Sequence, residues 1–79
     1  MSPSEKTRRL SAMNPGTSGK VVRVSRENPD RADRLMALGV TPGAKVTILQ
    51  RFPGVVFLCD QTELAVEPAV ARSIVVESE

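Results

Sequence analysis

Hydrophobic and polar residues alternate over several short stretches of this 79-residue chain, and turn-forming residues separate one stretch from the next. A period of two is the pattern of a half-buried strand. The predicted strands cover residues 20–26, 45–51, 55–59, 63–66 and 73–76. In the first of them, Val22 and Val24 share one face, with Lys20 and Arg26 at its ends. Residues 68–72 are too few for a full helix and predict a single helical turn.

One longer helix is predicted between the first two strands. Asn28 is a favourable N-cap, Pro29 fits the first turn, and Asp30 complements the positive end of the helix dipole. The helix should end at about Leu38. Its predicted buried stripe consists of Ala32, Leu35, Met36 and Gly39. A short helix with one apolar side must pack against another element, and the end of a barrel is the expected place.

Two glycines set the path of the chain after this helix. Gly39 can take the left-handed conformation that ends a helix, with Val40 packing back on the last turn. Pro42 fixes φ at the second position of a turn, and Gly43 accepts the positive φ that a type II turn needs next. None of these four residues can act as an acid, a base, a nucleophile or a metal ligand. The segment of the chain with the clearest structural pattern therefore favours a binding module over an enzyme.

The predicted elements fit a mainly β fold, a small antiparallel β-barrel of about five strands with one short helix and one helical turn. Barrel closure would also remove exposed edge strands. We expect a flexible tail over residues 1–9, one domain over residues 10–76 and a short tail over residues 77–79. A single domain of this size buries only about 60–65% of the surface of its unfolded chain. Hydrophobic residues make up 41% of the chain, with two Phe and no Trp or Tyr, so the core should be aliphatic and leave little room for a deep ligand pocket.

Charge and cysteine content point to a cytoplasmic protein without a polyanionic partner. Eleven basic and nine acidic residues give a formal net charge of +2, which is nearly balanced. The first twenty residues are basic and the end of the chain is acidic, which a solvated tail at each end would explain. One cysteine cannot form an internal disulfide, and no signal-like or membrane-spanning apolar run is present.

The chain offers little for catalysis or metal binding, so we expect no catalytic residues, no cofactor and no metal site. It contains no histidine, no Cys-x-x-Cys spacing and no phosphate-binding glycine loop between a strand and a helix. Cys59 lies in the apolar strand over residues 55–59 and precedes Asp60, whose charge would raise the thiol pKa. Cys59 is therefore expected to be an inert packing residue, the alternative being a partial metal or redox contact.

Three segments together resemble a known family. They are the Leu-x-x-Leu-Gly-Val-x-Pro-Gly-x-x-Val pattern of residues 35–46, the Gly-Lys-Val start of the first strand at residues 19–21, and the Ala-x-x-Ile-x-Val pattern of residues 71–76. With Glu-Leu-Ala-Val at residues 63–66, they resemble the FeoA family of bacterial ferrous-iron transport proteins. The likeness extends from about Leu10 to Val76, and the combination of the central and final patterns is more specific than either alone.

The resemblance implies an SH3-like β-barrel and a cytosolic accessory or regulatory role in ferrous iron uptake. FeoA-like proteins are thought to dock on the cytoplasmic, GTP-binding part of the FeoB transporter, so a FeoB-like transporter is the expected partner. The protein would then be peripheral to the membrane only through that partner. Having no histidine and one cysteine, the chain is poorly equipped to carry iron itself.

Two places are predicted to contact the partner, because surplus apolar or charged groups there stand beside tight turns. The predicted contact residues are Arg31, Arg34, Met36, Val40, Thr41 and Pro42 in and after the helix, and Phe52, Val55 and Phe57 around the next hairpin. The strand over residues 55–59 is apolar on both faces, which burial beneath the helix or tail would explain, or else a protein-contact surface. A weak homodimer through this strand is a further expectation.

Two other functions stay open as alternatives. The basic residues of the N-terminal half are Arg8, Arg9, Lys20, Arg23 and Arg26, and the segment from residue 19 to 24 has a loose likeness to strand starts of KOW-type RNA-binding barrels. Nucleic acid is nevertheless not the expected partner, because stacking aromatic residues are lacking. An SH3-like peptide-binding module is the other alternative, although the chain lacks the aromatic groove such ligands need.

Overall fold

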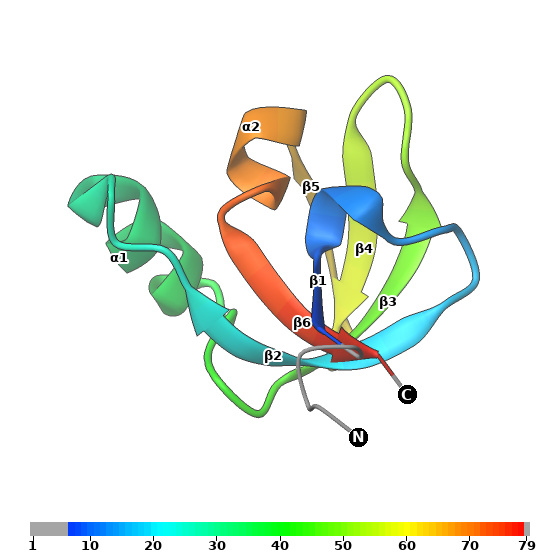
Figure 1. Ribbon diagram of the computed structural model, residues 1–79, viewed down its shortest axis with the longest axis horizontal. Helices are drawn as coiled ribbons and strands as arrows, with labels where there is room; N and C mark the ends of the chain where they lie inside the picture. Colours follow the sequence, from blue (N-terminus) through cyan, green and yellow to red (C-terminus); the bar gives the residue numbers. More distant parts are fainter. Residues whose placement is uncertain (1–6, 79) are drawn as a thin grey trace.

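The computed structural model describes residues 7–78, which form one six-stranded antiparallel sheet with three short helical segments (Figure 1). The strands are β1 (Thr7–Arg9), β2 (Ser18–Val24), β3 (Lys45–Gln50), β4 (Val55–Cys59), β5 (Thr62–Val66) and β6 (Ile74–Ser78). The helical segments are the 3-10 turn η2 (Leu10–Ala12), the helix α1 (Pro29–Ala37) and the short helix α2 (Pro68–Ala71). The mainly β antiparallel prediction is confirmed, with all five predicted strands present and β1 as a sixth.

The sheet curves around its core but is not closed by strand pairing. The strand order is β1-β6-β2-β3-β4-β5, so β1 and β5 stand at the two edges. The expected closure of the barrel is therefore incomplete within the described residues. At one end, α2 and η2 pack against each other, whereas α1 lies to one side of the sheet (Figure 1). The sequence predicted that α1 would cover the end of the barrel. In the structure, α2 and η2 cover that end instead.

The folded part of the chain is longer at both ends than the predicted domain over residues 10–76. Residues Thr7–Arg9, expected in a tail, form β1 and pair with β6, with Arg8 opposite Val76. Glu77 and Ser78 continue β6, which pairs with β1 on one edge and with β2 on the other. Strand pairing depends on backbone hydrogen bonds, and the side chains of these residues are mostly polar. The hydrophobic pattern of the sequence therefore did not predict that these residues form strands. The other tail residues, 1–6 and 79, lie outside the described residues.

The start and end of α1 follow the prediction closely. The Asn28 side-chain oxygen Oδ1 accepts a hydrogen bond from the Arg31 N–H at 3.1 Å, which makes Asn28 the N-cap. At the other end, the Gly39 N–H donates to the Met36 carbonyl at 3.0 Å and the Val40 N–H donates to the Leu35 carbonyl at 2.9 Å. These two bonds and the positive φ of 97° at Gly39 form a Schellman motif, which satisfies carbonyls that the helix end would leave unpaired.

The turn after the helix is also confirmed. The Ala44 N–H donates to the Thr41 carbonyl at 3.0 Å, and Gly43 has a φ of 94°. This is the type II geometry that Pro42 and Gly43 predict. The turn is tied to β2 as well, because the Gly43 N–H donates to the Val21 carbonyl at 2.8 Å. Local hydrogen bonds therefore fix the whole path from α1 into β3.

The buried stripe of α1 is narrower than predicted. Ala32 and Leu35 are buried, but Met36 is 49% exposed and Gly39 is exposed. Gly39 follows the end of α1, and Met36 lies at the edge of the stripe set by Ala32 and Leu35, so both remain in solvent.

Two β-bulges change which side chains face the core. In β2, Val21 lies opposite Val76 and Arg23 lies opposite Val75, so Val22 is an extra residue without a counterpart. The bulge buries Val21 and leaves Val22 42% exposed, whereas Val24 packs against the core, so the prediction that Val22 and Val24 share one face is wrong. In β3, the same shift between Ile48 and Gln50 makes Leu49 the extra residue.

The core is aliphatic apart from one aromatic ring, as the composition predicts. Its largest fully buried side chains are Phe57, Leu10, Ile48, Ile74, Val40, Val46, Val55 and Val76. In β4 the pattern alternates, with Val55, Phe57 and Cys59 buried and Val56 and Leu58 half-buried. In the described part of the chain, no helix has the length and apolar character to cross a membrane.

Candidate protein-contact surfaces

Three of the nine predicted contact residues belong to the core. Val40, Val55 and Phe57 are at most 1% exposed, so their side chains cannot reach a partner in this fold. Val40 turns inward because the Schellman motif packs the residue after Gly39 against the last helical turn. Val55 and Phe57 point inward because they share the core-facing side of β4. For these three residues the contact prediction is wrong.

The other six predicted residues lie at the surface, in two separate places. Phe52 is 85% exposed in the β3–β4 turn. The remaining five form what we call the helix surface: Arg34, Met36 and Pro42, which are exposed, and Arg31 and Thr41, which are half-buried. Figure 1 places α1 and the β3–β4 turn on opposite sides of the sheet. The structure therefore does not join the two predicted places into one continuous patch.

A shallow apolar hollow of about 740 Å³ surrounds Phe52, and we call it the hairpin hollow. Its lining residues are Ser11, Pro15, Leu49, Gln50, Arg51, Phe52, Val55 and Pro68. They come from η2, the loop after it, the β3–β4 hairpin and α2, which lie at the same end of the molecule (Figure 1). Most of the lining that solvent can reach is apolar, which is the character of the central part of a protein interface.

The hairpin hollow depends on the bulge in β3. Because Leu49 is the extra residue of this bulge, its side chain is 43% exposed although its neighbour Ile48 is fully buried. On the rim, the Arg51 Nη1 group donates to Asn14 Oδ1 at 3.1 Å, which ties the hairpin to the loop after η2. Sequence reasoning identified Phe52 but missed Leu49, and the adjacent apolar pair Ile48-Leu49 within an alternating strand was the available signal.

A second hollow, of about 520 Å³, lies between α1 and the segment from β5 to α2. Arg31, Arg34, Leu35 and Leu38 line it from the helix side, and Ala65 and Val70 line it from the other. Asp30 and Glu67 also border it, so charges of both signs surround a modest apolar floor. This hollow is the more polar of the two predicted contact regions.

The five basic residues considered for RNA binding do not form one surface. Arg26 is engaged by Asp33, with 3.2 Å between Nη2 and Oδ1. Arg8 and Arg9, neighbours on β1, line two different hollows. Lys20 stands opposite Glu77 in the pairing of β2 with β6. Arg9 and Arg23 line the same hollow, but the other three basic residues lie elsewhere, so the five do not form one basic face.

Cys59 has the environment of a packing residue. Its side chain is 3% exposed within the core cluster, and its Sγ donates to the Gly39 carbonyl at 3.4 Å. Burial, and secondarily the charge of Asp60, raise the pKa of the Cys59 thiol above its ordinary value of 9.0. Within residues 7–78, no three carboxylate or thiolate side chains gather into a cluster able to hold a metal ion.

These features define a class of protein: a small, mainly β domain of SH3-like architecture whose most distinctive site is an apolar surface hollow. The sequence profile of the FeoA domain matches residues 8–78, and the chain therefore belongs to the FeoA domain family. This family is associated with ferrous iron transport. No curated protein sequence matches the chain significantly.

Solved structures of FeoA proteins share the fold. A crystal structure of an iron uptake regulatory protein, FeoA, has a TM-score of 0.84 at 25% identity and covers 92% of this chain and 99% of its own. The solution structure of FeoA from Chlorobium tepidum has a TM-score of 0.79 at 30% identity, covering 90% of this chain and 70% of its own. FeoA from Stenotrophomonas maltophilia, solved with zinc, has a TM-score of 0.77 at 27% identity, covering 86% and 87%. That protein is described as a prokaryotic SH3 domain protein and is proposed to be an activating factor of ferrous iron transport.

A similar domain occurs in larger proteins. A manganese-dependent transcriptional repressor superimposes with a TM-score of 0.86 at 24% identity, and the match covers 92% of this chain but 42% of the repressor. At this identity the likeness concerns the fold alone.

Proposed function

We propose that the protein is a non-catalytic, cytoplasmic accessory factor of ferrous iron uptake that binds the cytoplasmic, GTP-binding part of a FeoB-like transporter. Membership of the FeoA domain family supports the link to ferrous iron transport. The observation that carries the proposed mode of action is the exposed Phe52 within the apolar hairpin hollow. An aromatic side chain that is 85% exposed gains stabilisation only when another molecule covers it.

The free energy available at this surface is sufficient for a specific contact. Complete burial of a Phe side chain contributes about 1.5–3 kcal/mol. Leu49 and the prolines around Phe52 would enlarge the covered apolar area, and aromatic anchors of this kind dominate many interfaces. The helix surface is the second candidate, with Met36 as its most exposed apolar residue among the predicted set.

A pull-down with the purified cytoplasmic domain of a FeoB-like transporter from the same organism tests the proposal. Phe52→Ser should weaken binding by about tenfold or more, since 1.4 kcal/mol corresponds to a factor of ten. Met36→Ser, an exposed apolar residue on the opposite side, is the matched control and should bind like the wild type. Phe57→Glu is unsuitable because Phe57 is fully buried, and a charge there would unfold the domain.

Two outcomes would contradict the proposal at different levels. If Met36→Ser weakens binding and Phe52→Ser does not, the contact lies on the helix surface and the hairpin assignment is wrong. If the wild-type protein fails to bind with and without guanine nucleotide, the transporter is not the partner.

A weak homodimer is also part of the proposal and concerns the outer face of β4. Val56 and Leu58 are half-buried there, whereas the backbone of β4 is already paired with β3 and β5. Self-association would therefore use side chains and not strand addition. Light scattering at several concentrations should show a rising apparent mass, which Leu58→Lys should abolish; a constant monomer mass would contradict the dimer.

A further inference from the structure

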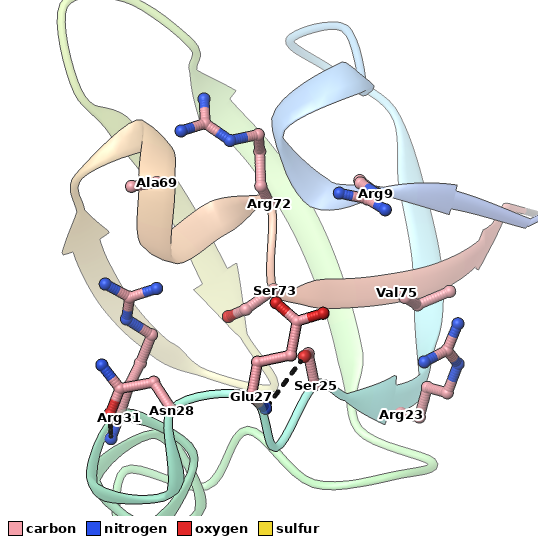
Figure 2. A pocket seen from close by; sticks show the side chains of 10 residues that line it. All are labelled: Arg9, Arg23, Ser25, Glu27, Asn28, Arg31, Ala69, Arg72, Ser73 and Val75. Carbon is pink, nitrogen blue, oxygen red and sulfur yellow. Dashed lines mark hydrogen bonds between the residues drawn. The ribbon is translucent and has the colours of Figure 1, made fainter.

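A cleft of about 550 Å³ gathers four arginine residues, of which one, Arg31, also belongs to the helix surface. We call it the arginine cleft, and its lining residues are Arg9, Arg23, Ser25, Glu27, Asn28, Arg31, Ala69, Arg72, Ser73 and Val75. The arginines come from four different elements: β1, β2, α1 and the C-cap of α2. Figure 2 shows their side chains around the edge of the cleft, with Glu27 between them beside Ser25 and Ser73.

The charge in the cleft is strongly unbalanced. Four arginines and one glutamate leave a local charge of +3, whereas the whole chain carries only +2. Within residues 7–78, the four guanidinium groups make no hydrogen bond or ion pair, although Arg26 nearby is paired with Asp33. The structure thus concentrates unpaired positive charge at one concave place.

The lower part of the cleft is ordered by hydrogen bonds. The Ser25 N–H donates to the Ser73 carbonyl at 2.7 Å, which joins the end of β2 to the start of β6. The Ser25 Oγ accepts from the Glu27 N–H at 3.3 Å (Figure 2), and its own hydroxyl hydrogen, which has no acceptor among residues 7–78, can donate to a ligand. Ser25, Ser73 and Arg31 are half-buried, so the floor is partly shielded from water. Shielding of this kind strengthens charge interactions with a bound anion.

We propose that the arginine cleft binds a compact multivalent oxyanion of the di- or triphosphate class. A planar monocarboxylate accepts hydrogen bonds mainly from two directions and neutralises one charge, whereas the cleft presents donors from several sides and three surplus charges. A diphosphate carries a matching charge and tetrahedral phosphorus centres whose oxygens point in several directions. The lining contains no aromatic residue, so it offers no stacking surface for a nucleobase and recognises the phosphate part alone.

Exposed arginine side chains would close on such a ligand from the positions seen here. Arg9, Arg23 and Arg72 are exposed, and exposed side chains change rotamer within nanoseconds. Ordering them costs conformational entropy, which limits the affinity of an otherwise strong charge match. Glu27 opposes binding because its carboxylate repels the anion.

An NMR titration of the full chain with inorganic pyrophosphate at constant ionic strength tests the proposal. We expect saturable shifts of the amides around Ser25 and Ser73. Arg23→Gln and Arg72→Gln should each weaken binding by about fivefold or more, and Glu27→Gln should strengthen it. Arg8→Gln is the matched control: it removes the same charge from the strand that carries Arg9 but lines a different hollow, and it should change the affinity less than twofold.

Further arms of the titration distinguish the sources of the anion. A nucleoside diphosphate should bind within about threefold of pyrophosphate, because the base gains no contact. Absence of saturable binding by the wild type would overturn the proposal. Equal weakening by Arg8→Gln and Arg72→Gln would also overturn the proposal, since that result would show general charge attraction. Tighter binding of a single-stranded RNA, weakened equally by the same two substitutions, would overturn it as well. These outcomes are independent of the FeoB contact, which rests on Phe52.

Discussion

Gly19 is the single residue on which the packing of β2 against β6 depends most directly. A Cβ atom at this position would lie 2.5 Å from the Glu77 carbonyl oxygen and 2.5 Å from Val76 Cγ1. Real Cβ atoms do not approach backbone so closely, so the two strands would have to separate. The Gly-x-Val segment that contributes to the family resemblance therefore has a steric cause here.

Gly19→Ala should destabilise the domain by about 3 kcal/mol or more, which is a large part of the stability of a small domain. Gly16→Ala is the matched control, because Gly16 has a φ of 88° but nothing within 4 Å of an added Cβ. It should cost only the conformational strain of about 1–2 kcal/mol. Urea unfolding followed by circular dichroism measures both values, and equal losses would show that steric contact at Gly19 is not the dominant effect.

Cys59 gives a prediction with a defined pH dependence. Burial and Asp60 raise its thiol pKa above 9.0, so the folded state keeps the thiol proton at a pH where the unfolded chain has lost it. The contribution of Cys59 to stability is therefore complete below pH 9.0 and is lost as pH rises through the folded-state pKa.

Urea unfolding at pH 7, 9 and 10 should show a decline for the wild type above pH 9 that is smaller in Cys59→Ala. Cys59→Ala should also be less stable at pH 7 because it leaves a small cavity in the core. Labelling of the native protein with a thiol reagent should be slow at pH 8. Fast labelling without unfolding would contradict the buried, proton-bearing thiol.

At the scale of elements, local hydrogen bonds explain both ends of α1. Its N-cap bond from Asn28 and its Schellman motif at Gly39 supply partners for groups at both helix ends. Because α1 lies to one side of the sheet and buries only Ala32 and Leu35, its stability depends on these ends more than on packing.

Asn28→Ala should reduce the free energy of unfolding by about 1 kcal/mol, since the Arg31 N–H loses its acceptor. Asn28→Asp retains an acceptor and should be close to neutral, which separates the capping effect from a general effect of substitution. Thermal unfolding followed by circular dichroism provides the comparison. A loss as large in Asn28→Asp as in Asn28→Ala would show that the cap bond is not what Asn28 contributes.

Elements that depend on residues close together in the sequence were predicted correctly, whereas β1 and the two bulges, which depend on distant residues, were not. The helix, its glycine stop and the Pro-Gly turn were predictable because each depends on residues within a few positions of one another. β1 was missed because Thr7–Arg9 are held by backbone pairing with β6, almost seventy residues later in the chain. The bulges at Val22 and Leu49 are equally non-local, since register is decided by the partner strand.

The predicted contact surface was partly wrong for the same reason. An apolar run such as residues 55–59 does not reveal which alternate side chains face the core, and Val55 and Phe57 proved to be inside. Phe52 was predictable because a turn places it outside both strands. The arginine cleft could not be anticipated, because its four arginines come from four different elements.

Across the whole molecule, the hairpin hollow and the arginine cleft differ in chemistry, and binding at each should respond differently to salt. The hairpin hollow is mainly apolar, so a contact there should weaken little between 50 and 300 mM salt. The arginine cleft is charged, so its affinity for pyrophosphate should fall severalfold over the same range. Calorimetric titrations at both salt concentrations make this comparison. A steep salt dependence of transporter binding would contradict a contact centred on Phe52.

The most direct test of the proposed contact is an NMR titration of the isotope-labelled protein with the unlabelled cytoplasmic domain of the FeoB-like transporter, with and without guanine nucleotide. The predicted result is saturable shifts or broadening centred on the β3–β4 turn around Leu49 and Phe52 and on the adjoining ends of η2 and α2. The amides of α1 should change little. Unchanged spectra under both nucleotide conditions, or changes confined to α1, would contradict the account.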